Sequence, residues 1–237
     1  MSYLKSTSEP ELARLAATIG EPTRVAMLAA MLGGQALPAG ELARRAGVAP
    51  ATASAHLLRM MESGLITRRS SGRHRYYALA GADVAAALEA LARIAPVESN
   101  HAQRASNGSL RFARTCYDHL AGTLGVLLTD TLMQKGLILG SSDCELTAQG
   151  QEWLCNFGID MPALRASRRP VVRACLDWSE RRDHLAGAVG TALLQTLLVR
   201  RWLVRVTGTR AVRLTLRGRE GLYRTLGLEL NQAGAFG

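Results

Sequence analysis

Cysteine is absent from the first 115 residues of this 237-residue chain, and the four that follow are Cys116, Cys144, Cys155 and Cys175. No apolar run is long enough to span a bilayer, and the N-terminus carries no secretory leader. An even number of cysteines would allow two disulfides in an oxidising compartment, but no other feature points outside the cell. We therefore expect a reduced, cytoplasmic protein with no membrane partner.

Acidic residues are also scarce: 19 Asp and Glu stand against 29 Lys and Arg, which gives a formal net charge of +10. The sequence holds no glycine-rich nucleotide fingerprint, P-loop, nucleophile elbow or zinc-protease motif, and its few carboxylates suggest no catalytic pair. We expect no enzymatic activity. The positive charge makes nucleic acid the first partner to consider, but many basic proteins bind none specifically, so a motif must decide.

Helical periodicity dominates the first segment. Apolar residues recur at helical spacing in four stretches, which we expect to be helices: Glu11–Ile19, Pro22–Leu32, Ala39–Ala46 and Pro50–Glu62. Gly47 provides the turn between the last two, and Pro50 suits the first position of the fourth helix. This spacing is typical of a helix-turn-helix.

The fourth helix has an apolar face and a polar face. Ala53, Leu57, Met60 and Met61 are expected to face the core. Short side chains let a backbone approach the major groove, while hydroxyl, imidazole and guanidinium groups reach base edges and phosphates. The expected DNA-contacting residues of this helix are Pro50, Ala51, Thr52, Ser54, His56 and Arg59.

A β-hairpin is expected next, with strands at Leu65–Thr67 and His74–Leu79 and a turn at Ser70–Gly72. Its tip is basic, and its candidate DNA-binding residues are Arg68, Arg69, Arg73 and Arg75. A run of charge is usually only a solvated surface. Directly after a helix-turn-helix, it is better interpreted as a wing that contacts phosphate or the minor groove.

The ordered motifs of this segment resemble the ArsR-type winged-helix repressors. The resemblance covers about Glu11 to Ile94, and it rests on Ile19–Arg24, Glu41–Ala43, Ala51–Leu57, Glu62–Ile66 and the Gly72-Arg73 wing. It implies a homodimer that binds a palindromic operator in double-stranded DNA, with an inducer or metal loosening the grip. By position, Thr52, Ser54, His56 and Arg59 match the recognition helix of the family, and Arg73 matches its wing.

One departure from the family affects the signal. Many metal-sensing members carry a Cys-x-Cys pair on the helix before the recognition helix, where this chain has Ala39-Gly40-Glu41-Leu42-Ala43. The metal site that the family places on that helix is therefore absent, and an effector must act elsewhere.

The second half contains an internal repeat. Asp118–Gly125 recurs as Asp183–Gly190, each continuing as an apolar helix and then as a hairpin and a helix start. We expect a mainly α fold with small β-hairpin wings (α+β). Its expected parts are a winged helix-turn-helix at 1–95, a linker at 96–110, and a duplicated effector or dimerisation domain at 111–237 with winged-helix-like repeats at about 111–160 and 167–230.

The repeats place His119 and His184 at equivalent positions. Cys116 lies three residues before His119, which would be one turn of a helix, and has no sequence counterpart in the second repeat. With Cys175, these residues form a candidate site for a transition metal such as zinc, with Asp118 and Asp183 orienting the imidazoles. A capped structural histidine and a redox-sensing thiol are the alternatives.

We therefore expect a sequence-specific DNA-binding transcriptional regulator, interpreted as a repressor modulated by a metal or small-molecule effector in the C-terminal region. A sequence-nonspecific architectural DNA-binding protein shares the charge but needs no duplicated C-terminal body. A protein-interaction scaffold is disfavoured by the outward-facing Thr52, Ser54 and Arg59. Paired Gly122 and Gly125, like Gly187 and Gly190, favour close helix packing over ligand contact.

Overall fold

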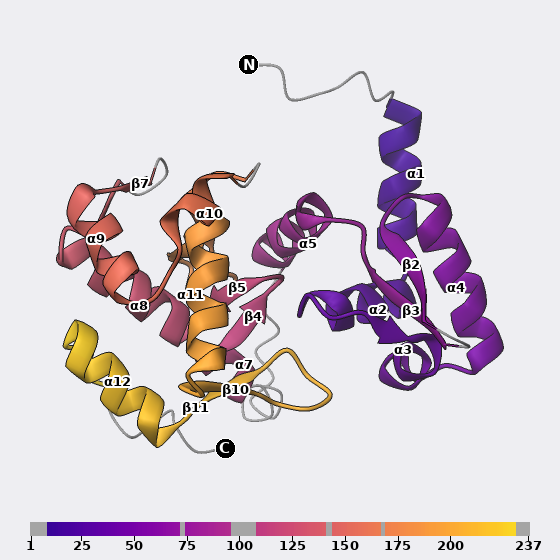
Figure 1. Cartoon of the computed structure of the whole chain (residues 1–237). Coiled ribbons are helices and arrows are strands. Elements are labelled where there is room, and N and C mark those ends of the chain that lie inside the picture. The colour runs from indigo at the N-terminus through magenta and orange to yellow at the C-terminus, as the bar shows by residue number, and fades with distance from the viewer. Residues whose placement is uncertain (1–8, 72–73, 96–107, 141–143, 167–168, 231–237) are drawn as a thin grey trace. The chain divides into compact units, whose positions relative to one another are not determined.

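The structure is a computed structural model, and it describes residues 9–71, 74–95, 108–140, 144–166 and 169–230. The chain divides into two compact units, Met1–Leu88 and Glu89–Gly237 (Figure 1). The division lies inside helix α5, which spans Ala82–Ile94. In the described residues, no helix is long and apolar enough to cross a membrane.

The first unit is a winged helix-turn-helix, as the sequence predicts. Its elements up to α5 are α1 (Glu9–Ile19), α2 (Pro22–Met31), β1 (Leu37–Pro38), α3 (Ala39–Ala46), α4 (Pro50–Glu62), β2 (Ile66–Ser71) and β3 (His74–Leu79). Glu21 caps α2 by accepting hydrogen bonds from the backbone N–H groups of Thr23 and Arg24. Gly47 ends α3 with a φ of 67°, which allows the sharp turn into α4.

The wing is longer than the sequence predicts. Strands β2 and β3 pair antiparallel from Ile66 opposite Leu79 to Ser71 opposite His74. Strand β1 completes the sheet in the order β1-β3-β2. The sequence does not reveal β1, because its two residues, Leu37 and Pro38, are too few to show a strand periodicity.

The second unit is built from short hairpins and helices. Its elements after α5 are α7 (Gly108–Phe112), β4 (Arg114–Cys116), β5 (His119–Ala121), α8 (Thr123–Gln134), β6 (Ile138–Leu139), β7 (Glu145–Leu146), α9 (Ala148–Asn156), α10 (Met161–Ala166), β8 (Arg173–Leu176), β9 (Asp183–Ala186), α11 (Gly187–Val199), β10 (Leu203–Arg205), β11 (Val212–Leu214) and α12 (Leu216–Leu226). The order hairpin, helix, hairpin, helix occurs twice, from β4 to α9 and from β8 to α12. These two segments are called the first and the second run below.

Two local predictions for these runs are wrong. His119 and His184 lie on strands β5 and β9, and not at the starts of helices. The turn from strand to helix comes only at Gly122 and Gly187, with φ values of 82° and 78°. A histidine-leucine-alanine stretch is too short to tell a strand from the first turn of the apolar helix behind it.

Each run packs its helix on the hairpin of the other run. Helix α8 contacts β9, α11 contacts β5, and the two strands contact each other. Glycine is required where each helix leaves its own strand: a Cβ on Gly125 would lie 2.6 Å from the carbonyl oxygen of Leu120, and one on Gly190 would lie 2.4 Å from that of Leu185. The same two Cβ atoms would lie 3.6 and 3.3 Å from the Cβ atoms of His184 and His119 on the other hairpin. The crossed packing therefore brings the two histidine-bearing strands together.

Candidate functional site

The first candidate site is the exposed face of α4. Ala53, Leu57 and Met60 are fully buried, with exposed fractions of 0, 1 and 0%. The helix therefore turns the rest of its surface outward. Five of the six predicted contact residues on it are exposed: Pro50, Ala51, Thr52, Ser54 and Arg59. This leaves a face of small and hydrogen-bonding side chains next to the wing.

His56, the sixth predicted contact residue, is half-buried and turned toward α2. Its Nδ1 lies 3.4 Å from Glu21 Oε2 and 3.3 Å from Arg24 Nη1. Arg24 is itself buried and donates to the backbone oxygen of Ala17. In the described structure, His56 thus holds the start of α2 against α4, a contact that the residue order alone does not reveal.

The wing carries exposed arginines as predicted from the sequence. Arg68 and Arg69 on β2 and Arg75 on β3 are all exposed, and Arg75 pairs in register with Ser70. Arg73 lies outside the described residues. The part of the wing that the structure describes therefore offers three cations for a polyanion.

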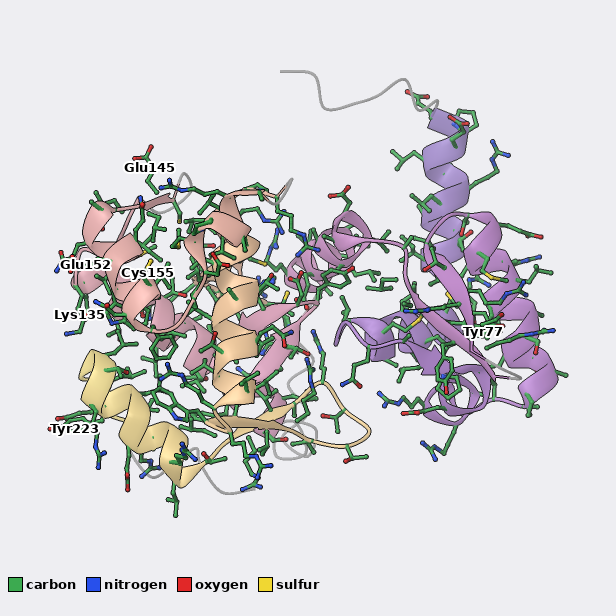
Figure 2. The ribbon with its side chains drawn as sticks, viewed as in Figure 1. Tyr77, Lys135, Glu145, Glu152, Cys155 and Tyr223 are labelled. Carbon is green, nitrogen blue, oxygen red and sulfur yellow. The ribbon has the colours of Figure 1, made fainter. Side chains whose placement is uncertain are left out.

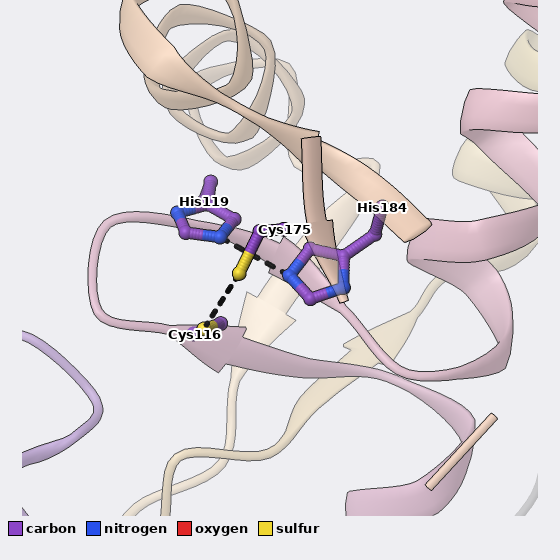
Figure 3. A group of neighbouring side chains, drawn as sticks. All are labelled: Cys116, His119, Cys175 and His184. Atoms are coloured by element: carbon purple, nitrogen blue, oxygen red, sulfur yellow. Dashed lines mark hydrogen bonds between the residues drawn. The ribbon is translucent and has the colours of Figure 1, made fainter. Parts of the chain in front are cut away.

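The second candidate site gathers the four predicted metal ligands, Cys116, His119, Cys175 and His184 (Figure 3). Cys116 on β4 stands directly opposite His119 on β5, and Cys175 on β8 stands directly opposite His184 on β9. Two predictions about Cys116 are thus wrong: it is a cross-strand neighbour of His119 and not one helical turn away, and Cys175 occupies the equivalent place in the second hairpin. The repeat hid this because the second hairpin has the longer loop.

The four ligand atoms converge. His119 Nε2 and His184 Nε2 are 3.1 Å apart, Cys116 Sγ and Cys175 Sγ are 4.0 Å apart, and all four atoms lie within 4.8 Å of one another. In a tetrahedral zinc site with bonds of about 2.3 Å to sulfur and 2.05 Å to nitrogen, the sulfurs would be about 3.8 Å apart and the nitrogens about 3.3 Å apart. The donor set and its spacing therefore fit a four-coordinate transition metal.

The cluster is closed to solvent on most sides. The exposed fractions are 3% for Cys116, 4% for His119 and 1% for His184, whereas Cys175 is half-buried. Four protein ligands would leave no open position for a substrate, which is typical of a structural or sensing metal site and not of a catalytic one.

Each imidazole has a carboxylate on its other nitrogen. Asp118 Oδ1 lies 3.2 Å from His119 Nδ1, as predicted. At His184, the carboxylate is that of Asp177, whose Oδ2 lies 3.3 Å from His184 Nδ1. The prediction that Asp183 orients this ring is wrong. The repeat aligns Asp183 with Asp118, but the longer second loop brings Asp177 back onto the ring instead. Such carboxylates fix the orientation of a ligating histidine.

Asp177 also organises the surrounding fold. It is fully buried, and it accepts hydrogen bonds from Arg114 Nη2 and from the Gly122 N–H, each at 2.7 Å. Arg114 stacks on Trp178, with 4.6 Å from its guanidinium carbon to the ring centroid. Burial alone would raise the pKa of Asp177, but His184, Arg114 and the Gly122 N–H hold it far below its ordinary value. No pattern in the sequence points to Asp177.

The surroundings shift the pKa values of the two cysteines in opposite directions and raise that of His184. The hydrogen bond to Cys175 and burial raise the pKa of Cys116, whereas the hydrogen bond from Cys116 lowers the pKa of Cys175 against the effect of burial, helped by the two histidines. Burial acts to lower the pKa of His184, but Asp177 and Cys175 outweigh it and raise this pKa to about 9. Of the two thiols, Cys175 is the one whose pKa is lowered, and the thiolate is the form of cysteine that binds metal.

Comparisons with known proteins agree with the architecture of the first unit. A family model described as a helix-turn-helix domain matches residues 19–69. The uncharacterized HTH-type transcriptional regulator YdfF of Bacillus subtilis is 40% identical over 224 residues, which cover 93% of this chain and 99% of that protein. The chain belongs to the HTH-type transcriptional regulators.

Two further known proteins match part of the chain. The HTH-type transcriptional regulator CmtR of Mycobacterium tuberculosis is 36% identical over 104 residues, which cover 42% of this chain and 87% of that protein. The solution structure of a homodimeric winged helix-turn-helix DNA-binding domain, Mb0332 from Mycobacterium bovis, is 25% identical and covers 41% of this chain and 97% of its own, with a TM-score of 0.35. This HTH-type regulator is accordingly a DNA-binding transcriptional regulator.

Proposed function

We propose that this regulator is a homodimeric, ArsR-like repressor that binds a palindromic operator. The exposed face of α4 carries the proposal, since Thr52, Ser54 and Arg59 are exposed while the opposite face of the same helix is buried. A helix with such a face enters the major groove and reads base edges with its outward side chains. Arg68, Arg69 and Arg75 of the wing contact the phosphate backbone beside it.

Substitutions on α4 and on the wing test this assignment. Operator DNA and random DNA are each titrated with every variant, and the affinities are compared with those of the wild type. We expect Thr52→Ala or Arg59→Ala to weaken operator binding by about 1–3 kcal/mol and to reduce the preference for the operator. We expect Arg69→Ala to weaken both DNAs alike and to lower the salt slope by about 1. Arg224→Ala on α12, whose side chain is 78% exposed, is the matched control for a lost surface cation.

An architectural DNA-binding protein would give another result. If neither Thr52→Ala nor Arg59→Ala alters the ratio of operator to random affinity, the wild type binds by charge alone and the recognition-helix assignment fails.

For the effector, we propose a transition metal such as zinc, held by Cys116, His119, Cys175 and His184. Metal binding would fix the two hairpins against each other. Two hydrogen bonds connect the neighbour of Cys116 to helix α5. The Thr115 N–H donates to the Arg210 carbonyl at 2.9 Å, and Arg210 Nη1 donates to Glu89 at 2.7 Å. Glu89 lies on α5, whose earlier residues belong to the DNA-binding unit.

Zinc is therefore expected to lower operator affinity by about 5–150-fold, the range of a typical coupling free energy. The measurement compares the operator affinity of the full chain with added zinc and with a chelator. His119→Ala should remove the difference, and Cys155→Ser on α9 should keep it. If zinc binds without changing the operator affinity, the metal is structural and not an effector. If no zinc binds, the metal proposal fails and small organic molecules are the next effectors to test.

A further inference from the structure

The two thiols of the cluster lie close enough to react with each other. Cys116 Sγ and Cys175 Sγ are 4.0 Å apart, although the residues are 59 positions apart in the chain. A disulfide has an S–S length of about 2.05 Å, so the two atoms need to approach by only about 2 Å. We propose that Cys116 and Cys175 form a reversible intramolecular disulfide when the protein meets a hydroperoxide.

The burial of the two sulfurs assigns their roles. Cys175 is half-buried, so a small oxidant reaches it first, whereas Cys116 is 3% exposed and is reached only by its neighbour. Cys175 is therefore the sulfur that the oxidant attacks, and Cys116 is the resolving thiol. The remaining cysteines lie elsewhere: Cys155 is exposed on α9 (Figure 2), and Cys144 Sγ lies 3.5 Å from the Gly140 oxygen, to which it donates.

The reaction balances in two steps. The Cys175 sulfur attacks one oxygen of hydrogen peroxide, the O–O bond breaks, and the leaving hydroxide takes the Cys175 thiol proton to become water, which leaves a sulfenic acid. The Cys116 sulfur then attacks the Cys175 sulfur, the S–O bond breaks, and the departing hydroxide takes the Cys116 proton as a second water. Two thiols and one peroxide thus give one disulfide and two waters, and a dithiol reductant reverses the change.

The disulfide would change the proposed metal site. Both sulfur ligands would be consumed, so two imidazoles would remain and zinc would lose half of its donors. This consequence rests on the proposed metal function, whereas the disulfide itself does not. Oxidation would therefore act on the same cluster as the metal and would compete with it for the two sulfurs.

The test uses full-length protein with Cys144→Ser and Cys155→Ser, treated with hydrogen peroxide in the presence of a chelator. We expect a mass loss of about 2 Da from the intact chain, loss of both alkylatable thiols, and complete recovery with dithiothreitol. Adding Cys116→Ser should abolish the mass loss and leave Cys175 as a sulfenic acid that a dimedone probe captures. In the wild type, proteolytic digestion should yield a linked peptide pair that contains Cys116 and Cys175.

The proposal is overturned if both thiols stay alkylatable at a peroxide concentration that oxidises the exposed Cys155 of the wild type. It is also overturned if the linked peptides join different chains. Zinc binding by the reduced protein and DNA binding are measured separately, so a failure of this inference is distinguishable from a failure of the proposed function.

Discussion

Replacement of Asp177 by alanine is expected to lower the free energy of unfolding of the second unit by about 3–5 kcal/mol. The variant removes the partner of Arg114, whose side chain is 1% exposed, and so leaves a buried cation without its counter-ion. It also removes the acceptor of the Gly122 N–H at the start of α8. Such a loss is a large part of the stability of a domain.

Urea unfolding followed by tryptophan fluorescence measures this effect. All three tryptophans, Trp153, Trp178 and Trp202, lie in the second unit, so the signal reports on that unit. Asp183→Ala is the matched control, because the repeat suggests Asp183 but the carboxylate at His184 Nδ1 is that of Asp177. We expect a change of about 0.5 kcal/mol or less. Equal destabilisation by the two variants would contradict the role of the Arg114–Asp177 pair.

Loss of a cluster ligand is expected to reduce zinc affinity by about 100-fold or more. Four ligands share an apparent binding free energy of about 10–16 kcal/mol in structural zinc sites, so each supplies about 3 kcal/mol, and every 1.4 kcal/mol is tenfold. The variants are Cys175→Ser and His184→Ala, measured by competition with a chromophoric chelator. Asp118 orients His119 but is not itself a ligand, so Asp118→Asn should cost about 10–100-fold.

Cys155→Ser controls for the loss of a thiol outside the cluster and should bind zinc like the wild type. Circular dichroism of each variant without metal establishes that the fold is kept. If both ligand variants retain the wild-type zinc affinity, the four residues do not form a single metal site.

The helix-turn-helix could be predicted because its signals are local. Helical periodicity, Gly47 at the turn and Pro50 at the first position of α4 each act within a few residues, and the buried positions Ala53, Leu57 and Met60 follow from the same period. The prediction is weakest for His56. Its ring is turned toward Glu21 and Arg24, which lie more than 30 residues earlier in the chain, and helical spacing carries no information about that contact.

For the metal cluster, the residue types were predictable and their geometry was not. A repeated Asp-His pair and two cysteines suggest ligands, but whether Cys116 and His119 share a helix or face each other across a hairpin depends on where the strand ends. The error at Asp183 has a similar cause, since a repeat aligns positions along the chain, whereas the length of the loop after β8 determines which carboxylate reaches the ring.

The sequence by itself determined the elements of the DNA-binding unit, the basic wing and the identity of the four candidate ligands, because periodicity, turn residues and side-chain chemistry are properties of the local chain. Only the tertiary structure decided that the ligands converge, that Asp177 supports them and that two thiols stand 4.0 Å apart. These features arise where α8 and α11 cross onto each other's hairpins. Contacts between residues nearly 60 positions apart depend on packing, which no local pattern encodes.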